Sequence, residues 1–393
     1  MTAHPEADFY RERRLPPYVF AEVNRLKLAY RHEGRDVIDF GMGNPDLPPA
    51  KHIVDKLCEV AADPRAHKYS ASQGVKSLRA ALSRYYARRF NVQIDPDREV
   101  CVTLGSKEGL ANLAQAITAP GDVILAPDPS YPIHMFGFLI AGAVVRPVGF
   151  KDPDDFLREA AYACKRSIPS PGALVLNFPS NPTAQVVDLD FYREAVKLAK
   201  AHDLVLISDL AYSEIYFDGD PPPSILEVEG ARDVAVEFTS MSKTYSMPGW
   251  RIGFAAGSRR LVDALKRVKS YLDYGAFTPI QIAAVAALDG PQDHVEYARE
   301  TYKARRDVMI ECFSRIGFDV PKPPATMFAW SPIPEAYREL GSVEFSKLLL
   351  EKTGVAVAPG LGFGERGDGH VRLAMVENEQ RIRQAARQMK GFF

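Results

Sequence analysis

The stretch S-M-S-K-T-Y-S-M-P-G-W-R-I-G-F, residues 240–254, contains two charged side chains, Lys243 and Arg251, and both are cations. A quarter of the chain is charged, so the twenty residues 238–257 should carry about five charges, but they carry only these two. Lysine and arginine are rarely buried without a partner, because removing a charge from water costs several kcal/mol. The stretch therefore predicts an anionic ligand or a partly neutral lysine, unless both side chains reach solvent over an apolar surface.

This stretch follows the last of five apolar runs that have the length of buried strands. The runs are residues 100–104, 123–126, 173–178, 204–208 and 234–238, and helical patterns lie around and between them at residues 77–88, 108–117, 189–202 and 260–271. Continuous apolar strands that alternate with helices indicate a mostly parallel sheet with both faces covered. We therefore expect a large α/β domain.

After about residue 290 the pattern changes. A long polar helix at residues 295–316 is followed by a Pro-rich turn at 321–324, short strands near Phe328 and His370, and a terminal amphipathic helix. This order predicts a second, smaller α+β domain. The expected division is an N-terminal segment (1–49) that joins the small domain, a large domain (50–290) and a small C-terminal domain (291–393).

Composition narrows the class of partner. The chain has 49 basic and 50 acidic residues without a block of like charges, so nothing indicates nucleic acid or an anionic membrane. The four cysteines are far apart and lack the spacing of a zinc site, so no metal is expected. The longest apolar run, residues 135–145, is too short to span a bilayer, and the first sixteen residues lack the apolar core of a signal peptide. We expect a cytoplasmic protein whose partners are small molecules or other proteins.

The carboxyl ends of the predicted strands are unusually polar, and ligands of open α/β sheets bind beyond these ends. Gly105-Ser106-Lys107 stands before a helix and offers backbone N–H groups, a hydroxyl and a cation to an anion. The polar residues at successive strand ends are Lys107, Asn181, Asp209, Tyr212, Lys243 and Arg251. Each alone is explained by a turn or a cap, but together they predict a site for an anionic ligand of aromatic size.

At this point the chain is identified as similar to a known family. The motifs N-F-P-S-N-P-T (177–183), S-D-L-A-Y (208–212) and the opening stretch resemble the signature of the fold-type I aminotransferases, which use pyridoxal 5'-phosphate (PLP). The matching motifs, in family order, are G-M-G-N-P-D-L-P (41–48), K-Y-S-A-S-Q-G (68–74), G-S-K-E-G (105–109), D-P-S-Y-P (128–132) and H-V-R-L-A (370–374). Within the family, the chain most resembles bacterial glutamate-pyruvate (alanine) aminotransferases and LL-diaminopimelate aminotransferases.

The resemblance implies catalytic and cofactor-binding roles. Lys243 would hold PLP covalently and then move a proton between the substrate and the cofactor. Asp209 would keep the pyridine nitrogen of PLP protonated, and Tyr212 and Asn181 would hydrogen-bond the ring oxygen O3'. The remaining implied cofactor contacts are Ser106, Lys107, Ser240, Ser242 and Arg251 at the phosphate, and Tyr131 stacked on the ring.

The resemblance also implies how substrate and a second subunit contribute. Arg372 would grip the substrate α-carboxylate through two parallel hydrogen bonds, assisted by the Gly43 backbone and the Asn181 amide. Tyr69 matches a tyrosine that reaches the cofactor phosphate of the partner subunit. The expected protein is therefore a homodimer with shared active sites.

The expected reaction transfers an amino group from alanine to 2-oxoglutarate. One aspartate-specific subgroup supplies a partner-chain arginine for the second carboxylate, but no lysine or arginine occurs here between Ser270 and Ala298. Alternative donors are LL-diaminopimelate, methionine and aspartate. The alternative class is a PLP-dependent C–S lyase; a transcription regulator would need a DNA-binding segment before the family match, which begins by about residue 17.

Overall fold

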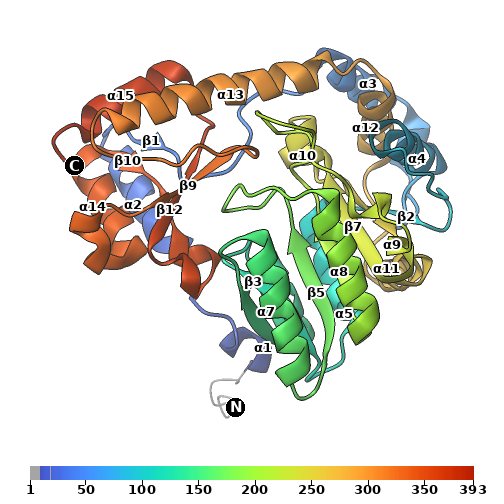
Figure 1. Cartoon of the computed structure of the whole chain (residues 1–393). Coiled ribbons are helices and arrows are strands. Elements are labelled where there is room, and N and C mark those ends of the chain that lie inside the picture. The colour runs from blue at the N-terminus through green and yellow to red at the C-terminus, as the bar shows by residue number, and fades with distance from the viewer. Residues whose placement is uncertain (1–8, 18) are drawn as a thin grey trace, which may run out of the picture.

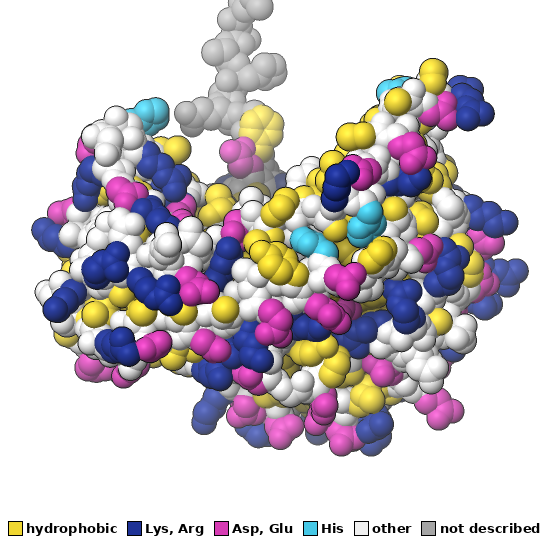
Figure 2. Space-filling view, turned by 90° about the horizontal axis from the view of Figure 1, so that it is seen from above, with side chains coloured by type: hydrophobic (Ala, Val, Ile, Leu, Met, Phe, Trp, Pro, Cys, Tyr) yellow, Lys and Arg dark blue, Asp and Glu magenta, His cyan; other side chains and the backbone are white. Residues whose placement is uncertain are grey.

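The computed structural model describes residues 9–17 and 19–393. Residues 1–8 of the predicted N-terminal segment, and Tyr18, lie outside the described residues. Within the described part of the chain, no helix is both long enough and apolar enough to cross a membrane. Figure 2 shows basic and acidic side chains interspersed over one face of the molecule.

A seven-stranded sheet forms the centre of the larger part of the molecule (Figure 1). Its strands, in spatial order, are β2 (Val100–Thr103), β8 (Gly253–Gly257), β7 (Ala235–Ser240), β6 (Val205–Asp209), β5 (Pro171–Asn177), β3 (Val123–Asp128) and β4 (Val144–Gly149). The strands β3 to β7 run parallel to one another, which confirms the predicted mostly parallel sheet. The sequence analysis missed β4 and β8. β8 is antiparallel to β7, and residues 241–252 connect the two strands.

Helices cover both faces of this sheet. One face carries α5 (Ser106–Ile117), α6 (Ile133–Ala141) and α11 (Arg259–Leu272) over an apolar core. The other face carries α3 (Lys51–Ala61), α4 (Lys76–Phe90), α7 (Pro153–Arg166), α8 (Leu189–His202) and α12 (Thr278–Asp289). The four predicted helices correspond to α4, α5, α8 and α11 with ends shifted by at most two residues.

A smaller region combines residues from both ends of the chain. Its sheets are β11 (Ala358–Pro359), β12 (His370–Ala374) and β9 (Phe328–Pro332), all antiparallel, and β1 (Ile38–Asp39) parallel to β10 (Val355–Ala356). Its helices are α2 (Phe20–His32), α13 (Asp293–Ser314), α14 (Gly341–Thr353) and α15 (Glu379–Met389). The helices α13, α14 and α15 share a second apolar core with strands of these sheets, whereas Val23 of α2 packs in a small separate cluster with Val37, Leu350 and Ala356. The predicted domain boundaries at residues 49 and 290 stay a prediction.

Two features position the functional side chains. The long helix α13 runs along the top of the molecule from the α15 side to α3 and α12, and so joins the two parts (Figure 1). The short helix α10 (Met241–Thr244) begins directly after β7 and carries Lys243; the other short helices are α1 (Tyr10–Arg13) and α9 (Ala231–Val234). Lys243 is thus fixed at the carboxyl end of a central strand.

Candidate active site

A cavity of about 360 Å³ lies at the carboxyl ends of the parallel strands, walled by both parts of the molecule. Every site residue predicted from the sequence lines it, except Tyr69. The predicted residues in its walls are Gly43, Ser106, Lys107, Tyr131, Asn181, Asp209, Tyr212, Ser240, Ser242, Lys243, Arg251 and Arg372. Segments as distant as residues 43 and 372 therefore meet in one site.

The amine of Lys243 lies in this cavity, and its Nζ donates a hydrogen bond to the Gly43 carbonyl oxygen at 3.1 Å. Burial, together with the positive charges of Arg372 and Arg251, lowers the pKa of Lys243 to about 8. A lysine with this pKa has a neutral population near physiological pH and is suited to nucleophilic and acid–base chemistry. This agrees with the expectation of a partly neutral lysine.

The N-terminus of α5 forms a candidate anion-binding corner. Gly105 has a φ of +84°, and a Cβ at this position would lie 2.4 Å from Arg251 Nη2, so the guanidinium packs directly on the glycine. Ser106 Oγ is buried and has no hydrogen-bond partner among the described residues. A helix N-terminus that lines the cavity, a hydroxyl with unused bonding capacity and a guanidinium together suit a phosphate group. Ser242 lines the same cavity and donates its backbone N–H to Ser240 Oγ at 3.1 Å.

A buried hydrogen-bonded row holds Asp209 at the end of β6. His134 Nε2 is 2.9 Å from Asp209 Oδ2, and Ser130 Oγ is 2.7 Å from His134 Nδ1. Asp209 Oδ1 accepts the backbone N–H of Ala211 at 3.2 Å. His134 is fully buried in α6, so the carboxylate is held in one orientation at the cavity wall. Sequence reasoning missed Ser130 and His134, because 75 residues separate His134 from Asp209.

Arg372 on β12 is also buried, and its two terminal nitrogens face different parts of the chain. Nη1 donates to Asn181 Oδ1 at 2.8 Å, and Nη2 donates to the Gly41 carbonyl oxygen at 3.2 Å. The guanidinium carbon lies 4.0 Å from the centroid of the Phe328 ring and 4.6 Å from that of Phe363. These rings orient the fork by cation–π contact, so it is pre-positioned for a carboxylate.

Gly43 lies between these groups because a larger residue does not fit. A Cβ at Gly43 would lie 2.6 Å from the Phe328 ring and 3.3 Å from Arg372 Nη2. The backbone of this segment can therefore approach both Lys243 and Arg372 only with glycine at this position. This gives a packing reason for the glycine-containing motif at residues 41–48.

Two predicted aromatic residues also line the cavity. Tyr212 is buried, and burial raises the pKa of its hydroxyl above the ordinary tyrosine value, so it stays a neutral hydrogen-bond donor at physiological pH. The Tyr131 ring lies 6.0 Å from the His134 ring, edge to face. Both are available beside a planar ligand.

The helix α2 contributes a wall that sequence reasoning did not identify. Phe20, Val23, Asn24 and Lys27 line the cavity and are spaced i, i+3, i+4 and i+7, which is one face of a helix. This helical periodicity was the one feature of the sequence that could have indicated the wall. Lys27 is 5% exposed, and its Nζ lies 2.8 Å from Asp39 Oδ2. Lys27, from the N-terminal part of the chain, is therefore a further buried cation in the cavity wall besides Arg372, which comes from the C-terminal part.

Tyr69 does not belong to this wall. Its side chain is 86% exposed, and its ring centroid lies 4.7 Å from that of Tyr274, which is also exposed. The predicted contact of Tyr69 with the cofactor of a partner subunit stays a prediction.

The residues present fit the predicted cofactor, PLP. The corner at Gly105, Ser106 and Arg251 matches its phosphate, the buried carboxylate of Asp209 matches a cationic ring nitrogen, and the Lys243 amine matches its aldehyde. Within the described residues no group of three or more His, Cys, Asp or Glu side chains is arranged to hold a metal ion.

Comparison with known proteins identifies relatives over nearly the whole chain. The family profile described as aminotransferase class I and II matches residues 35–389. The glutamate-pyruvate aminotransferase AlaC of Escherichia coli is 53% identical over 389 residues, covering 99% of this chain and 94% of that protein. An LL-diaminopimelate aminotransferase of Moorella thermoacetica is 40% identical over 385 residues, covering 97% of each chain. The substrate-bound structure of BacF from Bacillus subtilis is 34% identical, with a TM-score of 0.90, and the match covers 100% of this chain and 98% of that chain.

Proposed function

This chain belongs to the class I and II aminotransferases, and we propose that it transfers the amino group of alanine to 2-oxoglutarate, giving pyruvate and glutamate. The family depends on PLP, so the chain is a PLP-dependent transaminase that acts on amino acids and oxo acids. This sets aside the C–S lyase considered from the sequence. The identity of the two substrates is the part that we propose.

The similarity to the glutamate-pyruvate aminotransferase AlaC, 53% over nearly the whole of both chains, carries the choice of alanine. The cavity lining supports it. Phe20 and Val23 offer apolar surface to a methyl side chain, while Lys27 and Lys107 are cations suited to the distal carboxylate of glutamate or 2-oxoglutarate. An enzyme that exchanges alanine for glutamate has to accommodate both kinds of side chain.

The proposed mechanism starts with the substrate α-carboxylate, which the fork of Arg372 binds in a bidentate pair. The neighbouring Asn181 amide and the Gly41 carbonyl already fix that fork, so little ordering is needed on binding. This places the substrate Cα toward the Lys243 amine, which lines the same cavity.

Lys243 would then move the proton from the substrate Cα to C4' of the cofactor, acting first as general base and then as general acid. Its pKa of about 8 suits both directions of transfer near neutral pH. When bound, PLP would supply an electron sink for the electron pair that the Cα–H bond leaves on the substrate. Asp209 keeps the cofactor ring nitrogen protonated, and His134 and Ser130 hold the Asp209 carboxylate in place.

We also propose that the active enzyme is a homodimer. The rings of Tyr69 and Tyr274 lie against each other and are exposed, and Tyr271 and Phe277, close to Tyr274 in the sequence, are exposed as well. Exposed aromatic side chains of this kind are suited to burial against a second copy of the chain. In that arrangement Tyr69 would reach the phosphate of the partner's cofactor.

LL-diaminopimelate is a second candidate donor, because a relative that is 40% identical over 97% of the chain acts on it. The two candidates are separated by initial rates with 2-oxoglutarate as acceptor and alanine, LL-diaminopimelate, methionine or aspartate as donor. The proposal predicts the highest kcat/KM with alanine. An LL-diaminopimelate rate that exceeds the alanine rate by about tenfold would overturn it, since tenfold corresponds to about 1.4 kcal/mol of transition-state preference.

A further inference from the structure

We propose that Lys269 is a positioning residue for the cofactor phosphate: with Glu108 and Asp273 it braces the phosphate loop, residues 104–107, against the exposed loop of residues 273–277. The proposal rests on the proposed function, because it takes Ser106 and Arg251 as the phosphate-binding residues. Lys269 does not line the cavity, so it would act only through the residues it holds.

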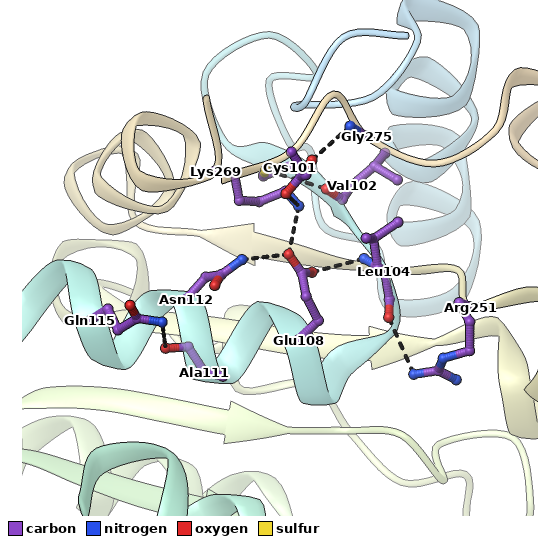
Figure 3. Close-up of polar contacts among 11 residues, drawn as sticks. Cys101, Val102, Leu104, Glu108, Ala111, Asn112, Gln115, Arg251, Lys269 and Gly275 are labelled. Carbon is purple, nitrogen blue, oxygen red and sulfur yellow. Dashed lines mark hydrogen bonds and ion pairs between the residues drawn. The ribbon is translucent and has the colours of Figure 1, made fainter. Parts of the chain in front are cut away.

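Lys269 forms the centre of a buried ionic triad on α11 (Figure 3). Its side chain is fully buried, and its Nζ lies 2.8 Å from Glu108 Oε1 and 2.8 Å from Asp273 Oδ2. Burial by itself lowers the pKa of Lys269, but the hydrogen bonds and negative charges of Asp273 and Glu108 outweigh it and raise the pKa above the ordinary lysine value. The amine therefore stays charged and bridges two carboxylates.

One arm of the triad holds the phosphate loop. Glu108 Oε2 accepts the backbone N–H of Leu104 at 2.8 Å, and the Leu104 carbonyl oxygen accepts Arg251 Nη2 at 3.2 Å (Figure 3). Glu108 Oε1 also accepts a hydrogen bond from Asn112. Glu108 thus fixes the residue immediately before Gly105 and, through it, the guanidinium at the anion-binding corner.

The other arm holds the exposed loop. Asp273 Oδ1 accepts the backbone N–H of Gly275 at 2.6 Å. Gly275 has a φ of +80°, and a Cβ there would lie 2.4 Å from the Ala71 carbonyl oxygen, so the loop packs tightly on the segment that follows Tyr69. The same loop carries Tyr274, whose ring lies against that of Tyr69.

Loss of the Lys269 amine would leave two carboxylates close together with their shared cation removed. Glu108 and Asp273 are largely shielded from water, with side chains 24% and 18% exposed, so their repulsion would be weakly screened. The repulsion is relieved only if one carboxylate moves. Each carboxylate accepts a backbone N–H, from Leu104 or from Gly275, so its movement would break that hydrogen bond. Both the phosphate loop and the exposed loop should then lose order.

The test compares Lys269→Met with Lys266→Met, a lysine on the same helix whose Nζ binds the Asp97 carbonyl oxygen at the surface. Equilibrium dissociation constants of the apo-protein are measured for PLP and for pyridoxal, which lacks the phosphate. Lys269→Met should weaken PLP binding by roughly 10- to 100-fold, the range typical of lost outer-shell support. Pyridoxal binding should change much less, and Lys266→Met should bind both ligands like the unmodified chain.

Two isosteric variants keep the test valid if Lys269→Met does not fold. The two carboxylate oxygens of Glu108 accept hydrogen bonds from the Leu104 N–H and from the Lys269 amine. A glutamine side chain has only one acceptor oxygen, so Glu108→Gln should weaken PLP binding. Asp273→Asn has the same defect toward Lys269 and Gly275, so sedimentation equilibrium should show weaker self-association of the apo-chain.

The brace would be overturned if Lys269→Met lost PLP binding and pyridoxal binding equally. It would also be overturned if Lys269→Met and Glu108→Gln folded and bound PLP as tightly as the control, Lys266→Met. Arg251→Met separates this failure from a failure of the proposed function. A loss of preference for PLP over pyridoxal in Arg251→Met alone overturns only the brace. An unchanged preference in both Arg251→Met and Lys269→Met also overturns the assignment of the phosphate site.

Discussion

His134 lies with its Nε2 2.9 Å from Asp209 Oδ2, and this contact joins the helix α6 to the end of strand β6 behind the candidate active site. The imidazole is fully buried, and Ser130 Oγ lies 2.7 Å from its other nitrogen. The Asp209 carboxylate is therefore oriented by a rigid partner while it lines the cavity. Fixed orientation matters because a carboxylate stabilises a cation on the cofactor ring most strongly when no reorganisation is needed.

The first prediction separates the charge of Asp209 from its shape. Asp209→Asn keeps the size and shape of the side chain but removes the charge and replaces one acceptor oxygen by an NH2 donor, so kcat should fall by about 100-fold or more. The melting temperature should change little. Stopped-flow measurement of the reaction with alanine provides the rate, and a kcat near the wild-type value would remove Asp209 from the proposed mechanism.

The second prediction concerns the fork of Arg372. Arg372→Lys replaces two parallel donors by one point charge, so KM should rise by roughly 10- to 100-fold for every amino donor and oxo acceptor alike. The uniform rise follows because all substrates share the α-carboxylate. Steady-state kinetics with alanine, glutamate, pyruvate and 2-oxoglutarate test it; a change confined to glutamate and 2-oxoglutarate would instead place Arg372 at the distal carboxylate.

The third prediction is a pH dependence of cofactor capture by the apo-protein. Burial and the charges of Arg372 and Arg251 hold the pKa of Lys243 at about 8, so the amine is mostly protonated below that pH and mostly neutral above it. Only the neutral amine attacks an aldehyde, so the rate of covalent capture should increase with pH through a midpoint near 8. Rapid-mixing absorbance records the rate. A midpoint near the ordinary lysine value would contradict the lowered pKa, and Lys243→Ala should abolish capture.

The fourth prediction asks which cation binds the distal carboxylate of glutamate. Lys27 is buried in the cavity wall and Lys107 is exposed at its edge. If one of these lysines binds the distal carboxylate, its replacement by methionine removes an ion pair. KM for glutamate and 2-oxoglutarate should then rise by about tenfold or more. KM for alanine should stay unchanged in that variant. Parallel kinetics of Lys27→Met and Lys107→Met decide between them, and unchanged glutamate kinetics in both would mean that another group serves.

Much of the fold was predictable because its determinants are local. Apolar runs identified β2, β3, β5, β6 and β7, and the polar residues that follow them were correctly expected to share one site. β8 escaped because its sequence G-F-A-A-G is rich in small residues and has no strand-like alternation. β4 is an edge strand, and its residues Val144 to Pro147 are not buried.

The residues that the sequence did not reveal depend on long-range packing. His134 gains its partner only when α6 packs against the sheet, and Phe363 reaches Arg372 only when the loop after β11 folds back. The helical face of Phe20, Val23, Asn24 and Lys27 was visible as a periodicity, but nothing in the sequence indicated that it faces a cavity. The role of Tyr69 depends on a second copy of the chain and stays a prediction.

The most direct test of the central claim is a single-turnover reaction of the PLP-loaded protein with alanine alone. Amino transfer from alanine predicts release of one pyruvate per active site, no ammonia, and then no further pyruvate until 2-oxoglutarate is added, when glutamate forms and pyruvate release resumes. Lys243→Ala should release no pyruvate. Continuous pyruvate and ammonia formation without an oxo acid, or a full single turnover with LL-diaminopimelate but none with alanine, would contradict the proposed reaction.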